Sequence, residues 1–198
     1  VLMDALSKVK AEFVIFDLGS GVNDVYLEIL KNVDNRVLVT SPEITSIEKL
    51  YRFIEANIVY SLQSKVNTQE LPILFKELRL NRTSGVDLLN SFLQFVRNSF
   101  PEAASEVDYL SQAPISLVIN SSRSQDDTEL GFSIQSVVSK YYGLKFSYAG
   151  AVDFDNAVWR SLRSKRPPII DQPFTGYVGQ FLSISKQLVD PILIRDVV

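Results

Sequence analysis

Residues 36–43 read Arg36-Val37-Leu38-Val39-Thr40-Ser41-Pro42-Glu43. The stretch 36–40, with its apolar centre at 37–39, predicts a strand that is buried on both faces, like the strands of a parallel sheet. Thr40 and Glu43 have the spacing of a capping box, and Pro42 suits the first turn of a helix. Apolar residues then recur at helical spacing through residues 44–54. A buried strand that leads directly into an amphipathic helix is the repeating unit of a parallel α/β sheet.

The alternation of strands and helices extends outward from this unit in both directions. Upstream, the pattern predicts an amphipathic helix at 1–10, a buried strand at 13–16 and a short helix at 25–33. Downstream, it predicts strands at 115–119 and within 144–152, and helices at 127–142, 156–163 and 177–188. Together these elements predict an α/β fold over residues 1–198, with a parallel sheet and helices in three layers.

Residues 57–113 interrupt this alternation. They carry apolar residues at helical spacing, among them Leu71, Leu74 and Leu78, and they contain no convincing strand. Parallel strands normally need only one crossover helix, so the extra helices are not required to close the sheet. We interpret residues 57–113 as a helical insertion that packs on itself as a small, removable cap. The alternative is that part of its apolar surface faces a partner protein.

The composition excludes several classes of function. The chain has 198 residues, a net charge of −3, no cysteine and no histidine. Disulfides, thiolate nucleophiles, histidine acid–base catalysis and zinc bound by cysteine or histidine are therefore excluded. The acidic balance does not favour a protein that coats nucleic acid, and no apolar run reaches membrane-spanning length. No secretory signal is visible, so the cytoplasm is the expected location.

Two candidate site residues follow predicted strands. Asp17 ends the apolar run at 13–16 and precedes Gly19 and Gly21, a pattern in which a carboxylate can hold Mg²⁺ while backbone amides approach phosphate oxygens. The alternative is a simple turn in which Asp17 caps the next helix. Asn120 ends the strand at 115–119, where its side-chain amide offers a donor and an acceptor to an adenine edge. The alternative is again an ordinary turn residue.

A third candidate is the segment around the predicted helix at 156–163. Four cations gather there, just before a Pro-Pro pair: Arg160, Arg163, Lys165 and Arg166. Such a cluster suits an anion or an acidic partner, whereas the alternative is a solvated helix face.

In this order along the chain, these stretches resemble MinD/ParA-type P-loop ATPases. Residues 13–21 resemble the switch II segment of that family, and residues 37–43 resemble the strand and helix start that follow it. Residues 117–120 resemble the next core strand, which ends in an Asn near the base. Residues 150–158, together with 163–168, resemble the late loop and helix that close over the nucleotide. The resemblance covers most of the chain except the insertion.

The resemblance implies a switch protein that binds ATP and Mg²⁺, hydrolyses ATP slowly, forms an ATP-dependent homodimer and serves cellular positioning or partitioning. It implies that Asp17 is the catalytic and metal-binding residue. It also implies a set of nucleotide-binding residues, which are Gly19, Gly21, Asn120, Asp153 and Asp155.

Two departures from the family pattern stand out. The family turn usually carries a Pro where this chain has Gly19. The sequence also contains no glycine before Asp17 and no Gly-Lys pair, so it holds no P-loop. We expect the P-loop and the first strand of such a domain to lie upstream of Val1, and we expect the chain alone to be inactive. The rival hypothesis is a non-catalytic interaction module that uses residues 57–113 or the basic segment 160–166.

Overall fold

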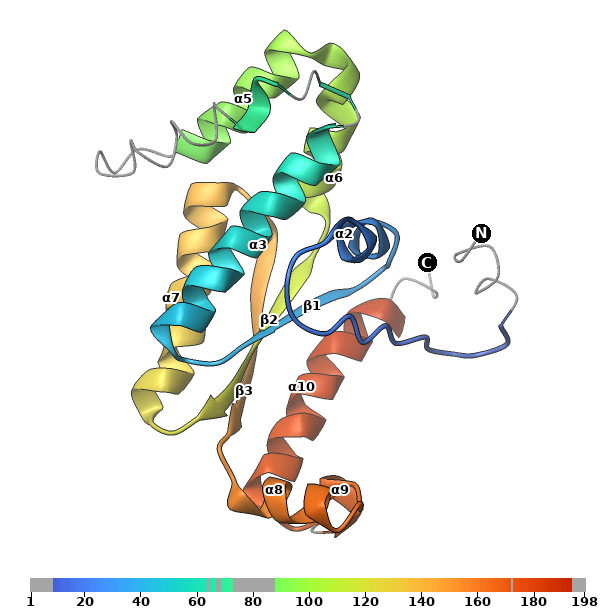
Figure 1. Cartoon of the computed structure of the whole chain (residues 1–198), viewed down its shortest axis with the longest axis vertical. Helices are drawn as coiled ribbons and strands as arrows, with labels where there is room; N and C mark the ends of the chain where they lie inside the picture. Colours follow the sequence, from blue (N-terminus) through green and yellow to red (C-terminus); the bar gives the residue numbers. More distant parts are fainter. Residues whose placement is uncertain (1–8, 64, 67–68, 73–87, 172, 194–198) are drawn as a thin grey trace.

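The computed structural model describes residues 9–63, 65–66, 69–72, 88–171 and 173–193. Its centre is a parallel sheet of three strands in the order β1-β2-β3 (Figure 1). The strands are β1 (Arg36–Thr40), β2 (Ile115–Ser122) and β3 (Phe146–Asp153). The predicted α/β fold with a parallel sheet is confirmed. Because all three strands run in the same direction, their carboxyl ends lie at one edge of the sheet.

The described helices follow the predicted alternation closely. Their bounds are α2 (Asp24–Lys31), α3 (Ile44–Gln63), α5 (Leu88–Ser99), the 3-10 turn η2 (Pro101–Ala103), α6 (Ala104–Gln112), α7 (Gln125–Tyr142), α8 (Asn156–Arg163), α9 (Pro168–Asp171) and α10 (Gly176–Leu193). Local signals set several of these ends. The Asn23 side chain accepts from the Tyr26 amide to start α2, and Gly143 ends α7 in the left-handed conformation. None of the described helices combines the length and apolar character needed to cross a bilayer.

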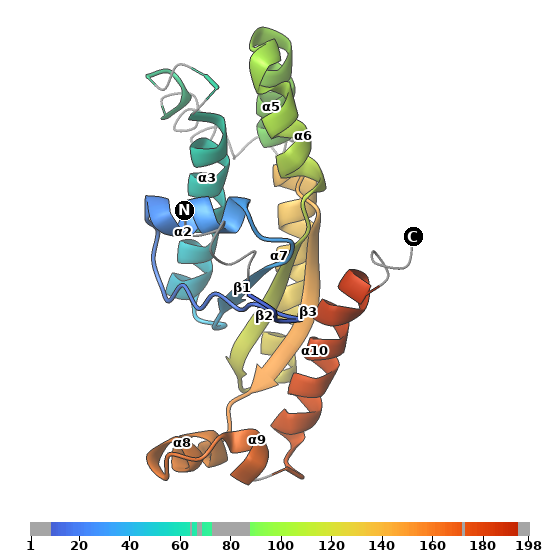
Figure 2. The same cartoon turned by 90° about the vertical axis from the view of Figure 1, so that its right-hand side faces the viewer.

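Helices cover both faces of the sheet. On one face, α3 and α7 bury Leu117 and Ile119 of β2 in the larger core. On the other face, α10 packs over Val118, Ala149 and Val152 in a smaller core. Figure 2 shows α3 and α10 on opposite sides of the strands. Alternate residues of β2 are thus buried in different cores, which explains its nearly continuous apolar sequence.

The helices of the expected insertion share the larger core. Residue 57 is not a boundary, because α3 continues through it to Gln63. Side chains of α5 and α6 belong to the same buried cluster as Leu117 and Ile134; they are Phe92, Leu93, Val96, Val107 and Leu110. We therefore replace the expected self-packed cap by a shared core. Leu74 and Leu78, which contributed to that expectation, lie outside the described residues.

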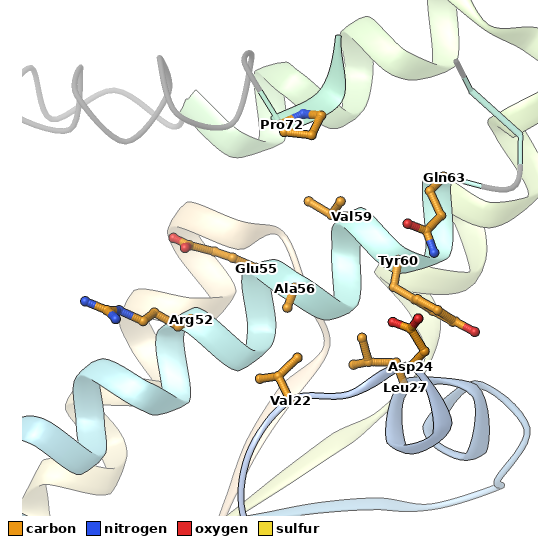
Figure 3. Close-up of a pocket in the computed structure, with 10 residues that line it drawn as sticks. All are labelled: Val22, Asp24, Leu27, Arg52, Glu55, Ala56, Val59, Tyr60, Gln63 and Pro72. Atoms are coloured by element: carbon orange, nitrogen blue, oxygen red, sulfur yellow. The ribbon is translucent and has the colours of Figure 1, made fainter. Parts of the chain in front are cut away.

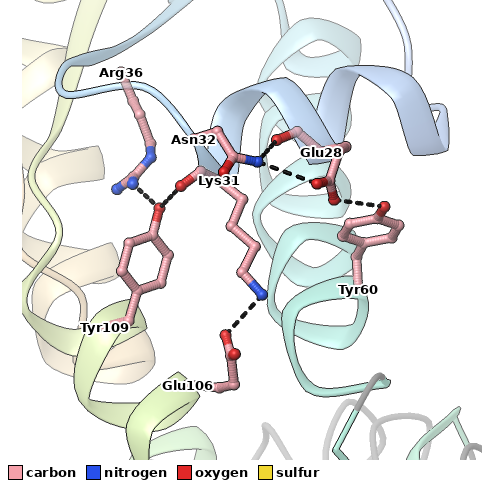
Figure 4. A network of polar contacts seen from close by, with 7 residues as sticks. All are labelled: Glu28, Lys31, Asn32, Arg36, Tyr60, Glu106 and Tyr109. Carbon is pink, nitrogen blue, oxygen red and sulfur yellow. Dashed lines mark hydrogen bonds and ion pairs between the residues drawn. The ribbon is translucent and has the colours of Figure 1, made fainter. Parts of the chain in front are cut away.

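A polar network also fastens α6 to the first half of the chain (Figure 4). The Arg36 guanidinium donates from Nε to the Leu30 carbonyl (2.6 Å) and also hydrogen-bonds the Tyr109 hydroxyl. The Tyr109 hydroxyl in turn donates to the Lys31 carbonyl (2.6 Å), and the Lys31 ammonium pairs with Glu106 (2.9 Å). Burial lowers the pKa of Arg36. The buried cation is stabilised because these partners and the Tyr109 ring, 4.8 Å away, surround it.

Three predicted features are wrong. The strand β1 forms, but it is not buried on both faces, because Val37 and Val39 are 39% and 62% exposed. Residues 13–16 do not form a strand: none of the described strands pairs with them, and Phe13, Val14 and Ile15 are 45%, 46% and 90% exposed. An apolar run becomes a strand only where a partner satisfies its backbone groups. Thr40 does not cap α3, because it is the last residue of β1 and its hydroxyl donates to the Ser41 carbonyl. The helix predicted at 1–10 lies mostly outside the described residues, and residues 9–10 are not helical.

Candidate functional site

The carboxyl edge of the sheet brings two of the predicted site residues together. Asn120 is paired in register with Val152, so it lies beside the residue that precedes Asp153. Both Asn120 and Asp153 are exposed at the ends of neighbouring strands. The open edge beyond the carboxyl ends of parallel strands is where α/β folds bind ligands.

A register shift shapes the end of β2. The pairing skips between Asn120 and Ser122, and Ser121 adopts a positive φ of 63°. The chain then enters α7 through a reciprocal cap: the Ser124 hydroxyl accepts from the Asp127 amide (3.1 Å), and the Asp127 carboxylate accepts from the Arg123 amide (2.8 Å). This cap fixes the backbone of Arg123 three residues after Asn120.

Asp153 is held in place by α10. The Gln180 side chain accepts from the Asp153 amide (2.9 Å) and donates to its carboxylate (2.7 Å). The next residue, Phe154, donates its amide to the Ser122 carbonyl (2.7 Å), which joins the ends of β2 and β3. The two strand ends and α10 therefore form one braced unit around Asp153.

An aromatic ring and a guanidinium stack at the same edge. The Arg123 guanidinium carbon lies 4.5 Å from the centroid of the Phe154 ring, which is 49% exposed. The edge of the sheet thus presents two flat groups, the Phe154 ring and the Arg123 guanidinium. The Asn120 side-chain amide adds a hydrogen-bond donor and an acceptor. The sequence reasoning missed Arg123 and Gln180 as site residues, and it included Phe154 only within the segment 150–158. No local pattern marks them, because the contacts that place them here come from different elements.

Asp155 has a local structural role. Its carboxylate accepts from the Ala157 amide (2.7 Å) and so caps the first turn of α8. Its predicted part in nucleotide binding stays a prediction. At the end of β1, the Ser41 hydroxyl contacts Glu43 and the Ser46 hydroxyl (2.8 Å), which organises the start of α3.

Asp17 lies in an exposed turn rather than at a strand end. Its carboxylate accepts from the Gly19 amide (3.3 Å), and Gly19 and Gly21 have φ of +68° and +109°, which other residues rarely adopt. Within the described part of the chain, no hydrogen bond or ion pair joins Asp17 to Asn120 or Asp153. Nor do the described residues contain a group of three or more carboxylates suited to a metal ion. A lone carboxylate fits Mg²⁺ only when phosphate oxygens and water complete the shell.

A separate pocket of about 380 Å³ lies between α2 and α3, away from the strand ends (Figure 3). Its walls come from the start of α2, one face of α3 and Pro72. Three of the polar side chains in its lining have partners within the protein. Arg52 pairs with Glu48 (2.5 Å), Glu55 accepts from the Tyr142 hydroxyl (2.9 Å), and Tyr60 donates to Glu28 (3.1 Å). None of the predicted site residues, all of which lie within the described part of the chain, lines this pocket.

Comparison of the chain with models of known protein families finds no match, and comparison with curated protein sequences finds none either. The candidate site therefore rests on the geometry of the sheet edge.

Proposed function

We propose that this chain forms the base-binding side of a MinD/ParA-type ATPase domain, which binds ATP with Mg²⁺ and hydrolyses it as a homodimeric switch. The observation that carries the proposal is the group at the sheet edge. Asn120 and Asp153 end neighbouring parallel strands, and the Arg123 guanidinium stacks on the exposed Phe154 ring beside them. The Asn120 amide, the Phe154 ring and the Arg123 guanidinium each have a matching part in an adenine base.

The Asn120 amide can donate to and accept from the edge of adenine, where a donor and an acceptor are adjacent. The exposed face of Phe154 and the plane of Arg123 suit stacking on a flat base, an interaction worth about 1–3 kcal/mol per base in nucleic-acid complexes. The Gln180 brace keeps the Asp153 carboxylate and its backbone fixed, so the edge is organised before a ligand arrives.

The phosphates and the metal require groups from outside these 198 residues, because the sequence holds no P-loop. Within the chain, Asp17 would supply one oxygen to Mg²⁺, whose charge would stabilise the negative phosphate oxygens during hydrolysis. Gly19 and Gly21 leave the backbone of this turn without side chains in the way of phosphate.

The solvent exposure of one face of β1 supports the same proposal. Val37 and Val39 of the edge strand β1 are 39% and 62% exposed, although their sequence is typical of a buried strand. The apolar residues 13–16 are also uncovered. A further strand that carries the P-loop and pairs with β1 would satisfy the edge of the described sheet, and the helix that follows a P-loop could cover the exposed face of β1.

The proposal is tested in a protein that contains the P-loop segment as well as this chain. We expect Asn120→Ala to weaken ATP binding more than GTP binding, because the amide reads the base. We expect Asp17→Asn to abolish Mg²⁺-dependent phosphate release without lowering the melting temperature. Equal losses for ATP and GTP would return Asn120 to the role of a turn residue. Unchanged hydrolysis in Asp17→Asn would remove Asp17 from the metal site.

The rival function is an interaction module that hydrolyses nothing. It is favoured by exposed apolar residues outside the sheet edge, such as Trp159 and Ile170, which are 58% and 74% exposed. The gene sequence upstream of Val1 discriminates between the two functions. A glycine-rich run that ends in Gly-Lys-Ser or Gly-Lys-Thr supports the ATPase, and a natural start codon at this position supports the module.

A further inference from the structure

The end of the molecule formed by α8 and α9 exposes apolar and basic side chains together. We call this the α8–α9 surface. Its apolar members are Trp159, Ile169, Ile170 and Phe174, and its basic members are Arg160, Arg163, Lys165 and Arg166. The most exposed are Ile170 at 74% and Phe174 at 101%. Large apolar side chains gathered at one place on a surface mark a site of contact with another body.

The α8–α9 surface projects from the rest of the protein. Figures 1 and 2, which differ by 90°, both show α8 and α9 at the lower end of the longest axis, beyond the carboxyl ends of the strands. A flat body can reach such an end without meeting the sheet or the helices around it. Contact between this end of the protein and a flat surface does not require a peptide-binding groove.

The exposed side chains stand on a firmly attached base. The Ser161 hydroxyl, which is fully buried, donates to the Asp171 carboxylate (2.9 Å) and so ties α9 to α8. The Tyr177 hydroxyl donates to the Pro168 carbonyl (2.8 Å), which ties α9 to α10. Hydroxyl groups are thus directed inward while Ile170 and Phe174 remain outside. The apolar exposure is built into the fold at this point.

The charge at this end opposes the charge of the whole chain. Residues 160–166 carry four cations and no acidic residue, whereas the chain has a net charge of −3. Within the described residues, Arg166 pairs loosely with Asp171 (3.7 Å), and Arg160, Arg163 and Lys165 make no ion pair. An anionic plane would therefore attract this end and repel the remainder, which orients the molecule.

We propose that the α8–α9 surface binds the face of an anionic phospholipid bilayer. Aromatic and aliphatic tips enter the boundary between headgroups and acyl chains, and neighbouring Lys and Arg side chains contact the lipid phosphates. Trp159 has the Arg163 guanidinium 4.8 Å from its ring, so an interfacial aromatic group and a cation are already paired. This proposal is independent of the proposed nucleotide site, because it uses neither Asn120 nor Asp17.

Vesicle binding with tryptophan fluorescence tests the proposal directly, because Trp159 is the only tryptophan in the chain. The whole chain is mixed with phosphatidylcholine vesicles and with vesicles of phosphatidylcholine and phosphatidylglycerol. We expect binding to the anionic vesicles, weakened by salt, with a blue shift of the Trp159 emission and quenching by brominated acyl chains. We expect little binding to the neutral vesicles.

Two pairs of variants separate the surface from general effects. Arg160→Gln with Arg163→Gln should lower vesicle affinity about fivefold for each cation removed. Its control, Lys49→Gln with Arg52→Gln, changes the net charge equally on α3 and should have a much smaller effect. Ile170→Ser should lower affinity by on the order of tenfold. Its control, Ile44→Ser, removes a residue that is 85% exposed elsewhere and should leave affinity unchanged.

Several results would overturn the proposal. One is the absence of binding to anionic vesicles at low salt, and another is binding without a change in Trp159 emission. A third is an equal loss of affinity in the surface variants and their controls. The same fluorescence titration is repeated with polyglutamate, which represents an acidic protein, and with duplex DNA, which represents a nucleic acid. A Trp159 shift with either of them, but not with vesicles, would assign the surface to an acidic protein or to nucleic acid instead.

Discussion

Leu93→Ala tests whether the helices of residues 57–113 complete the main core. Leu93 lies on α5, is 2% exposed and belongs to the same cluster as Leu117 of β2. Truncation of a buried Leu to Ala costs about 2–5 kcal/mol, from lost burial and the remaining cavity. If α5 and the sheet unfold together, this loss applies to the whole domain rather than to the helices alone.

Hydrogen exchange at the backbone amides of β2 shows whether the loss of stability in Leu93→Ala extends to the sheet. A cost of about 2–5 kcal/mol corresponds to exchange between about 30-fold and about 5,000-fold faster at residues that open only by global unfolding. In urea, with a slope of about 2 kcal/mol/M, the same cost lowers the unfolding midpoint by about 1–2.5 M.

Phe95→Ala is the matched control, because Phe95 lies on the same helix but is 47% exposed. We expect it to cost less than about 1 kcal/mol. Unchanged β2 exchange in Leu93→Ala, with faster exchange in α5 and α6 only, would refute the shared core. The insertion would then be a separate cap, and a linker from Ala56 to Pro114 would be expected to leave a folded sheet.

Three further predictions concern Gly131, Tyr148 and the ATPase activity of the chain alone. Gly131→Ala should destabilise the fold by about 1–3 kcal/mol in a thermal melt, because a Cβ there would lie 2.2 Å from the Tyr148 ring; an unchanged melt would show that the ring gives way freely. Tyr148→Phe should stabilise the fold by about 1 kcal/mol at neutral pH, because the Tyr148 hydroxyl is buried without a hydrogen-bond partner in the described part of the chain. Burial also raises the pKa of Tyr148, so the folded protein should lose stability as pH rises above about 10, and Tyr148→Phe should reduce that loss in alkaline urea titrations. The chain alone should release no phosphate from MgATP above background, and turnover that disappears in Asp17→Ala would contradict this expectation.

The sequence was most informative where the deciding interactions are local. The β-branched run at 36–40 and the helix at 156–163 have the predicted bounds, and Gly143 ends α7 as expected. These features depend on periodicity and on end signals a few residues apart, which a single sequence displays.

Predictions failed where distant partners decide the outcome. Residues 13–16 look like a buried strand, but whether they pair depends on a neighbour that local pattern does not reveal. The Arg36–Tyr109 contact joins residues 73 apart and draws α6 into the main core.

At the candidate site, strand position predicted Asn120, whereas Asp153 was named only through the resemblance to MinD/ParA-type ATPases. The Gln180 brace on Asp153 comes from 27 residues away, and the Arg123–Phe154 stack joins the ends of two strands. Neither contact corresponds to a periodic pattern of residues in the sequence. Chemistry at strand ends was therefore predictable, whereas the side chains that organise it were not.

The central claim is that the carboxyl edge of the sheet binds an adenine base. Its most direct test is a nuclear magnetic resonance titration of the isotope-labelled chain with ATP and, separately, with GTP. We expect saturable shifts in the millimolar range at the amides of Asn120, Arg123 and Phe154, larger for ATP than for GTP, since the base contacts are present and the P-loop is not. Shifts confined to the pocket between α2 and α3, or no saturable shift with either nucleotide, would contradict the account.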